Sequence, residues 1–134
     1  TIVYCSAGAS GHRSLKKVNL DGESSEFASD PGTDLMRPVV SPDRSMVACH
    51  RGMNEIVTFP ASGGSPTVAA SGAFADSYLG GAMFAWSPDS AWITYSTPLQ
   101  RSVAVNAVEV KSKRNVLVAK VGKSASGAMF SPDA

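Results

Sequence analysis

Short apolar runs recur along the chain and are separated by polar stretches rich in glycine, proline and serine. Several segments alternate apolar with polar residues, as in Lys17-Val18-Asn19-Leu20, and a period of two is typical of a half-buried β-strand. No long segment carries the 3.6-residue period and capping residues of an amphipathic helix. The pattern predicts an all-β chain with strands at 2–6, 15–20, 25–28, 38–40, 46–50, 56–59, 67–70, 83–86, 92–96, 103–110, 115–119 and 128–130.

The tripeptide Ser-Pro-Asp occurs three times, at spacings of 46 and 44 residues. Proline presets φ at the second position of a type I turn, and serine and aspartate are favoured turn residues. We therefore expect structural turns rather than a catalytic or metal role, because turns placed one per repeat would be spread around a ring. The nine residues are Ser41, Pro42, Asp43, Ser87, Pro88, Asp89, Ser131, Pro132 and Asp133.

The tripeptides divide the chain into three units, 1–45, 46–90 and 91–134. Each unit holds about four short strands, which is the size of one β-propeller blade. The run at 2–6 matches the apolar runs that follow Ser-Pro-Asp elsewhere, so 128–130 is expected to provide the innermost strand of an N-terminal blade. Asp21-Gly22 predicts a two-residue hairpin turn.

The run Trp86-Ser87-Pro88-Asp89-Ser90-Ala91-Trp92-Ile93-Thr94-Tyr95-Ser96 resembles the WD40-like repeats of TolB-type and tricorn-type propellers. Those repeats often have glycine after the aspartate. Arg44 and Ser90 stand there in this chain, which predicts a turn without positive φ at that position. The resemblance implies a ring of six or seven blades, and it is compatible with a periplasmic or a cytoplasmic location.

Three blades are fewer than the 4–8 of a typical closed propeller, and an unclosed stack leaves apolar blade faces uncovered. Two copies would give six blades with two identical junctions, so we expect a homodimer. The expected interface residues are Ile2, Tyr4, Phe74, Tyr78, Leu79, Met129 and Phe130. Two alternatives remain open: the remaining blades belong to a longer polypeptide, or the chain is a fragment made to study propeller assembly.

The composition is that of an ordinary globular protein, with 43% hydrophobic residues, 17% charged residues and a formal net charge of +1. This charge gives no case for nucleic-acid binding, and no apolar run approaches the ~18 residues of a membrane span. A mild cluster of basic residues is interpreted as solvent-exposed charges on turns and outer strands. Binding of an anionic partner is the less favoured interpretation. The members of the cluster are Lys111, Lys113, Arg114, Lys120 and Lys123.

Cys5 and Cys49 are assigned to the same place in their repeats, where the third unit has Tyr95. Equivalent positions on stacked sheets lie ~10 Å apart, beyond the ~7 Å that a disulfide spans, so two free, buried thiols are expected. His12 and His50 are expected to be surface or core residues rather than ligands.

The sequence contains no CxxC, HExxH or GxSxG motif, so neither a metal, a cofactor nor an enzymatic activity is expected. The expected function is a non-catalytic propeller scaffold for protein or peptide binding, as TolB-type propellers imply. The tricorn-type resemblance implies the alternative, part of a larger propeller-containing hydrolase whose catalytic part lies outside these residues.

Overall fold

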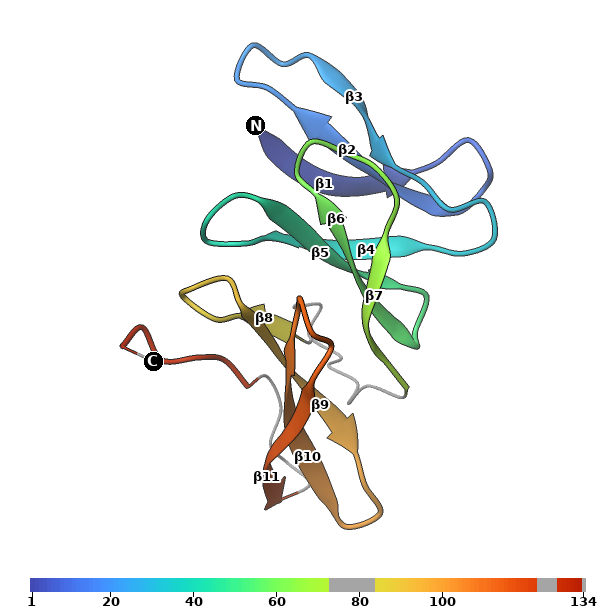
Figure 1. Cartoon of the computed structure of the whole chain (residues 1–134). Helices are drawn as coiled ribbons and strands as arrows, with labels where there is room; N and C mark the ends of the chain where they lie inside the picture. The colour runs from blue at the N-terminus through green and yellow to red at the C-terminus, as the bar shows by residue number, and fades with distance from the viewer. Residues whose placement is uncertain (73–83, 123–127, 134) are drawn as a thin grey trace.

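The computed structural model describes residues 1–72, 84–122 and 128–133 (Figure 1). All regular secondary structure in these ranges is β-strand. Among these residues the structure contains no helix that is long and apolar enough to cross a membrane. The strands are β1 (Ile2–Ala7), β2 (Arg13–Val18), β3 (Ser24–Ala28), β4 (Leu35–Val40), β5 (Met46–Arg51), β6 (Glu55–Pro60), β7 (Thr67–Ser71), β8 (Phe84–Trp86), β9 (Trp92–Pro98), β10 (Ser102–Glu109) and β11 (Asn115–Gly122).

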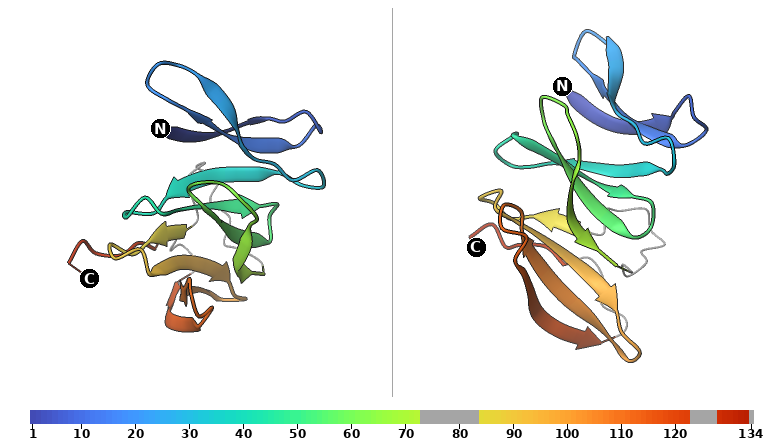
Figure 2. Two further views of the ribbon diagram at one scale, coloured as in Figure 1. Left: turned by 45° about the horizontal axis from the view of Figure 1, so that its top comes forward. Right: turned by 45° about the vertical axis from the view of Figure 1, so that its right-hand side comes forward.

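The strands form three antiparallel sheets that stack one upon the next, as the turned views in Figure 2 also show. Their orders are β1-β2-β3, β4-β5-β6-β7 and β8-β9-β10-β11, so within each sheet the strands pair in the order of the sequence. The expected all-β architecture of blade-like sheets is confirmed. The first sheet has three described strands. Its first strand, β1, corresponds to β5 and β9, which are the second strands of the other two sheets.

The first interface between sheets is an apolar layer. Phe27 of β3 meets Phe59 of β6 edge-to-face, with ring centroids 5.9 Å apart. Alternation along β5 places Val47 and Cys49 on the side of the first sheet. The buried members of this layer are Leu15, Leu35, Val47, Cys49, Val57 and Phe59.

The second interface uses the opposite face of the middle sheet. Ala48 of β5 and Ile56 of β6 pack there against the third sheet. The third sheet contributes Phe84, Trp86, Ile93, Tyr95 and Val108. Stacking thus buries apolar side chains on both faces of the middle sheet.

The assignment of Cys5 and Cys49 to one repeat position is wrong. Cys5 packs against the first apolar layer from the first sheet, whereas Cys49 enters the same layer from the middle sheet. Tyr4 is instead the counterpart of Tyr95: its hydroxyl bonds Ser24 Oγ at 2.8 Å, and Tyr95 bonds Asn115 at 2.6 Å. A shift of one residue reverses the face of a strand, and the repeat spacing varies by more than that. Both thiols are free, as predicted, but Cys5 is only half-buried.

Two turn predictions are also corrected. The β2–β3 hairpin is closed by Asn19 and Glu23, so its loop has three residues, with Gly22 at φ 86°. Arg44 and Ser90 do have positive φ, 63° and 62°. The turn geometry that suits glycine is therefore kept although these residues have side chains.

Candidate functional site

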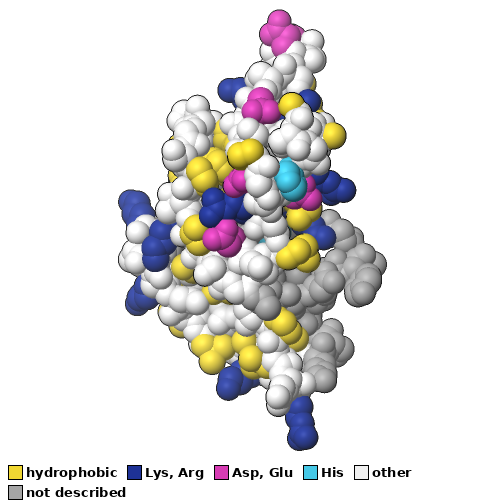
Figure 3. Space-filling model, turned by 90° about the vertical axis from the view of Figure 1, so that its right-hand side faces the viewer, with side chains coloured by type: hydrophobic (Ala, Val, Ile, Leu, Met, Phe, Trp, Pro, Cys, Tyr) yellow, Lys and Arg dark blue, Asp and Glu magenta, His cyan; other side chains and the backbone are white. Residues whose placement is uncertain are grey.

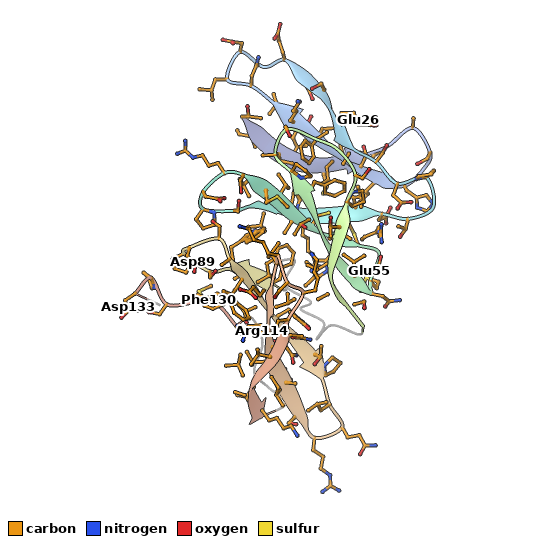
Figure 4. All side chains as sticks on the ribbon, in the orientation of Figure 1. Glu26, Glu55, Asp89, Arg114, Phe130 and Asp133 are labelled. Atoms are coloured by element: carbon orange, nitrogen blue, oxygen red, sulfur yellow. The ribbon has the colours of Figure 1, made fainter. Side chains whose placement is uncertain are left out.

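The loops lie at two opposite ends of the stacked sheets (Figure 1). The β4–β5 and β8–β9 turns, which contain Ser-Pro-Asp, are at one end, and the β5–β6 and β9–β10 loops are at the other. Figure 4 shows Asp89, Phe130 and Asp133 at the first end and Glu55 at the second. We call these ends the turn face and the loop face.

The first Ser-Pro-Asp turn satisfies its own polar groups. Ser41 Oγ donates to Asp43 Oδ1 at 2.6 Å and accepts from the N–H of Met46 at 3.0 Å. Asp43 also accepts from the backbone and hydroxyl of Ser45. These hydrogen bonds lower the pKa of Asp43 to about 2, and the bond from Ser41 has the largest effect.

The other two Ser-Pro-Asp turns contain the same hydrogen bond from the serine hydroxyl to the aspartate carboxylate. Ser87 Oγ donates to Asp89 Oδ1 at 2.5 Å, and Ser131 Oγ donates to Asp133 Oδ1. The serine lowers the pKa of each carboxyl group below its usual value. In the described ranges, no three His, Cys, Asp or Glu side chains converge as a metal site. The geometry is that of turns with internally satisfied carboxylates.

The loop face carries a cleft of about 750 Å³ that spans the first two sheets. His12 enters it from the β1–β2 loop, Asp34 from the β3–β4 loop, and Arg51 and Glu55 from the two ends of the β5–β6 loop. Figure 3 views this face and shows a histidine beside acidic and basic side chains. The full lining is His12, Thr33, Asp34, Met36, Arg51, Gly52, Met53, Asn54, Glu55, Ser71 and Gly72.

Two charged pairs lie along the lining of the cleft. Asp34 Oδ1 accepts from the N–H of Arg13 at 2.7 Å and lies 3.5 Å from His12 Nδ1. Arg51 Nε donates to Glu55 Oε2 at 2.6 Å, and this bond raises the pKa of Arg51. Among the described residues, the second oxygens of Asp34 and Glu55 and the terminal nitrogens of Arg51 have no partner. They are available to a ligand.

Sequence reasoning did not find this cleft. Its residues come from four loops that are far apart in the chain, and none belongs to a recognisable motif. One local feature of the sequence marks the cleft: Gly52 follows Arg51 and adopts a positive φ of 59° at the start of the tight β5–β6 loop. Only the stacking of the first two sheets brings the charged pairs together.

The predicted interface residues lie apart from the cleft. Ile2 is 57% exposed, and Tyr4 is half-buried on the same strand. Met129 is 78% exposed, and Phe130 is half-buried outside any described strand. Phe74, Tyr78 and Leu79 lie outside the described residues. The far face of the third sheet is less open than expected, because Thr94 and Ser96 are buried.

Two titratable groups are buried in the middle sheet. Burial, and secondarily the charge of Arg37, lowers the pKa of His50 to about 4. His50 meets the ring of Phe84 edge-to-face at 5.2 Å between centroids. Burial raises the pKa of the Cys49 thiol to about 12. Both groups are therefore neutral core residues near pH 7.

Comparisons with known proteins identify similar folds among solved structures. No protein-family model matches the sequence, and no curated protein matches it. Among solved structures, the tricorn protease is 16% identical with a TM-score of 0.67, over 89% of this chain and 12% of its own. TolB from Acinetobacter baumannii is 15% identical with a TM-score of 0.67, over 95% and 31%. An oligogalacturonate lyase in complex with manganese is 11% identical with a TM-score of 0.69, over 90% and 36%.

These similar proteins are β-propellers. The chain spans roughly a third or less of TolB and the tricorn protease, and little more of the lyase. At such identities the likeness concerns the backbone alone. Together with the stacked antiparallel sheets, it shows that the chain has the β-propeller fold and covers part of such a propeller.

Proposed function

We propose that this chain is a non-catalytic β-propeller scaffold that binds a protein or peptide segment in the cleft of its loop face. The observation that carries the proposal is the pairing of Asp34 with His12 and of Glu55 with Arg51 along one cleft of about 750 Å³. Each pair is preorganised and leaves donors or acceptors open. Exposed Met53 adds an apolar contact at the rim.

A peptide suits this cleft better than a small molecule does. The cleft is open and spans two sheets, and its polar groups are spread over four loops rather than converging on one point. Main-chain amides and mixed side chains of a peptide can meet such a row of donors and acceptors. Because strand ends form the floor of the cleft, binding a peptide costs the protein little conformational entropy.

The test is selection of a random linear peptide library against the immobilised 134-residue chain, followed by titration of the selected peptides. Glu55→Gln should weaken binding about fivefold or more, because it removes the charge of a carboxylate that lines the cleft. Glu23→Gln is the matched control, since it lies in the β2–β3 loop at the turn face. Equal losses from both variants, or no selected peptide, would overturn the proposal.

We also propose that the scaffold closes its ring by pairing two copies. Two features support this: the first sheet has three described strands where the others have four, and Ile2 is exposed on it. Residues 128–130 pair with no described strand, yet the turn after them forms its Ser131–Asp133 bond. In the proposed dimer, this segment becomes the innermost strand of the partner's first sheet.

Light scattering behind a sizing column tests the pairing. A mass near twice 13.9 kDa that withstands tenfold dilution is expected. Met129→Pro should give the monomer, because proline cannot donate to the new strand pair, whereas Met129→Ala should leave the dimer intact. A stable monomer of the unchanged chain would contradict the pairing and would favour further blades on a longer polypeptide.

A further inference from the structure

The third sheet ends in an unusually long open edge. β11 has eight residues and pairs only with β10. Its other edge makes no backbone hydrogen bond in the part of the chain that the structure describes. Alternate N–H and C=O groups of such a strand point away from the sheet and form a template for another strand.

The side chains of β11 are equally unusual. Val116, Leu117 and Val118 are consecutive, and they are 39%, 52% and 61% exposed. The corresponding edge strands β3 and β7 have five residues each, and β3 begins with Ser24-Ser25-Glu26. Proteins usually protect sheet edges by shortness or charge, as β3 does, so β11 departs from the plan of its own repeat.

Basic residues lie before this strand and on it. Lys111, Lys113 and Arg114 occupy the β10–β11 turn, and Lys120 lies on β11 itself. Arg114 lies 5.0 Å above the ring of Trp92 and 3.8 Å from Glu109. Lys111 and Lys113 line a second pocket together with Asp43, Asp89 and Glu109. Lys120 is exposed and has no ion pair among the described residues, so its charge is the one left open on the strand.

We infer that β11 is a docking edge for an extended segment of another protein with alternating acidic and apolar residues, which adds as a fifth strand. The open backbone edge accepts only an extended chain, and the apolar triplet provides contacts on both faces of the added strand. Exposed Lys120 on the strand favours acidic residues in the added segment. A second copy of β11 fits poorly, because it would bring Lys120 and the basic turn close to like charges.

The probe is a soluble, end-capped synthetic peptide of alternating glutamate and valine with a fluorescent label, titrated with the full chain and followed by anisotropy. Saturable binding is expected, whereas a lysine–valine peptide of the same length should not bind. Two further peptides carry N-methyl groups on alternate residues along one edge or the other. One of them should lose binding, because strand addition needs the N–H groups of one edge.

Charge variants locate the site. Lys120→Glu should weaken binding about threefold or more, as expected when an exposed attraction becomes a repulsion. Lys17→Glu on β2 of the first sheet makes the same change at a distance and should have no effect. Circular dichroism verifies that both variants fold. Amide hydrogen exchange of residues 115–122 should slow when the glutamate–valine peptide is bound.

Three results would overturn the inference. Equal binding of both N-methylated peptides would show that main-chain pairing is not involved. Equal effects of Lys120→Glu and Lys17→Glu would place the binding elsewhere. Self-association of the chain that Leu117→Glu abolishes would show that a second copy occupies the edge.

Discussion

The indole N–H of Trp86 donates a hydrogen bond of 3.1 Å to the carbonyl oxygen of Val39, which lies 47 residues earlier in the chain. Trp86 belongs to β8 and Val39 to β4, the innermost strands of neighbouring sheets. The bond therefore connects two neighbouring blades, while the ring fills the apolar layer between them.

Trp86→Phe should lower the free energy of unfolding by about 1–3 kcal/mol, because it leaves the Val39 carbonyl without this partner and removes part of the ring. Urea denaturation measures the change. Trp92→Phe is the matched control: the half-buried Trp92 ring contacts Arg114, and its indole N–H makes no hydrogen bond given for the described residues. A loss at Trp92 as large as that at Trp86 would show that ring volume, not the bond, matters.

Arg44→Gly should stabilise the chain by about 0.5–1 kcal/mol, because Arg44 has φ 63° and its positive φ strains any residue with a Cβ. Ser90→Gly relieves the same strain but also removes Ser90 Oγ, which accepts from the N–H of Asp43 at 3.0 Å. We expect the second substitution to gain less or to destabilise. Thermal unfolding compares the two, and a destabilising Arg44→Gly would contradict the strain.

Stability should fall as the pH decreases from about 6.5 to about 4. The pKa of His50 is about 4 in the folded chain and near 6.5 when unfolded, so in this window only the unfolded chain takes up the proton. The loss is on the order of 3 kcal/mol at pH 4, and it does not grow further below that pH. His50→Leu should remove most of this dependence in urea titrations. Asp43, with a pKa of about 2, contributes only at lower pH.

Cys5 should react with iodoacetamide at least about tenfold faster than Cys49 at pH 8. Cys5 is half-buried, whereas Cys49 is buried and its pKa of about 12 leaves almost no thiolate. The single-cysteine variants Cys5→Ser and Cys49→Ser allow the rates to be measured by mass spectrometry. In guanidinium the two rates should converge, and a difference that persists there would not come from burial.

Much of the strand pattern follows from local chemistry. Alternation of apolar and polar residues predicted the hairpins, and Ser41-Pro42-Asp43 and its repeats marked the turns after the innermost strands. Errors arose where one residue decides the outcome. The repeat spacing could not define the face of Cys5, and the loop length at Gly22 depends on hydrogen bonds between Asn19 and Glu23.

The all-β class, the repeat and the turn positions could be predicted from the sequence, because turn chemistry and strand period act over a few residues. Which sheet faces meet and which strand edges stay open became clear only from the arrangement of the three sheets. The loop-face cleft joins Asp34 to Glu55 through the stacking of two sheets, and the exposure of Leu117 on β11 depends on what lies beside that strand. Stacking acts between residues distant in the chain, and no local pattern records it.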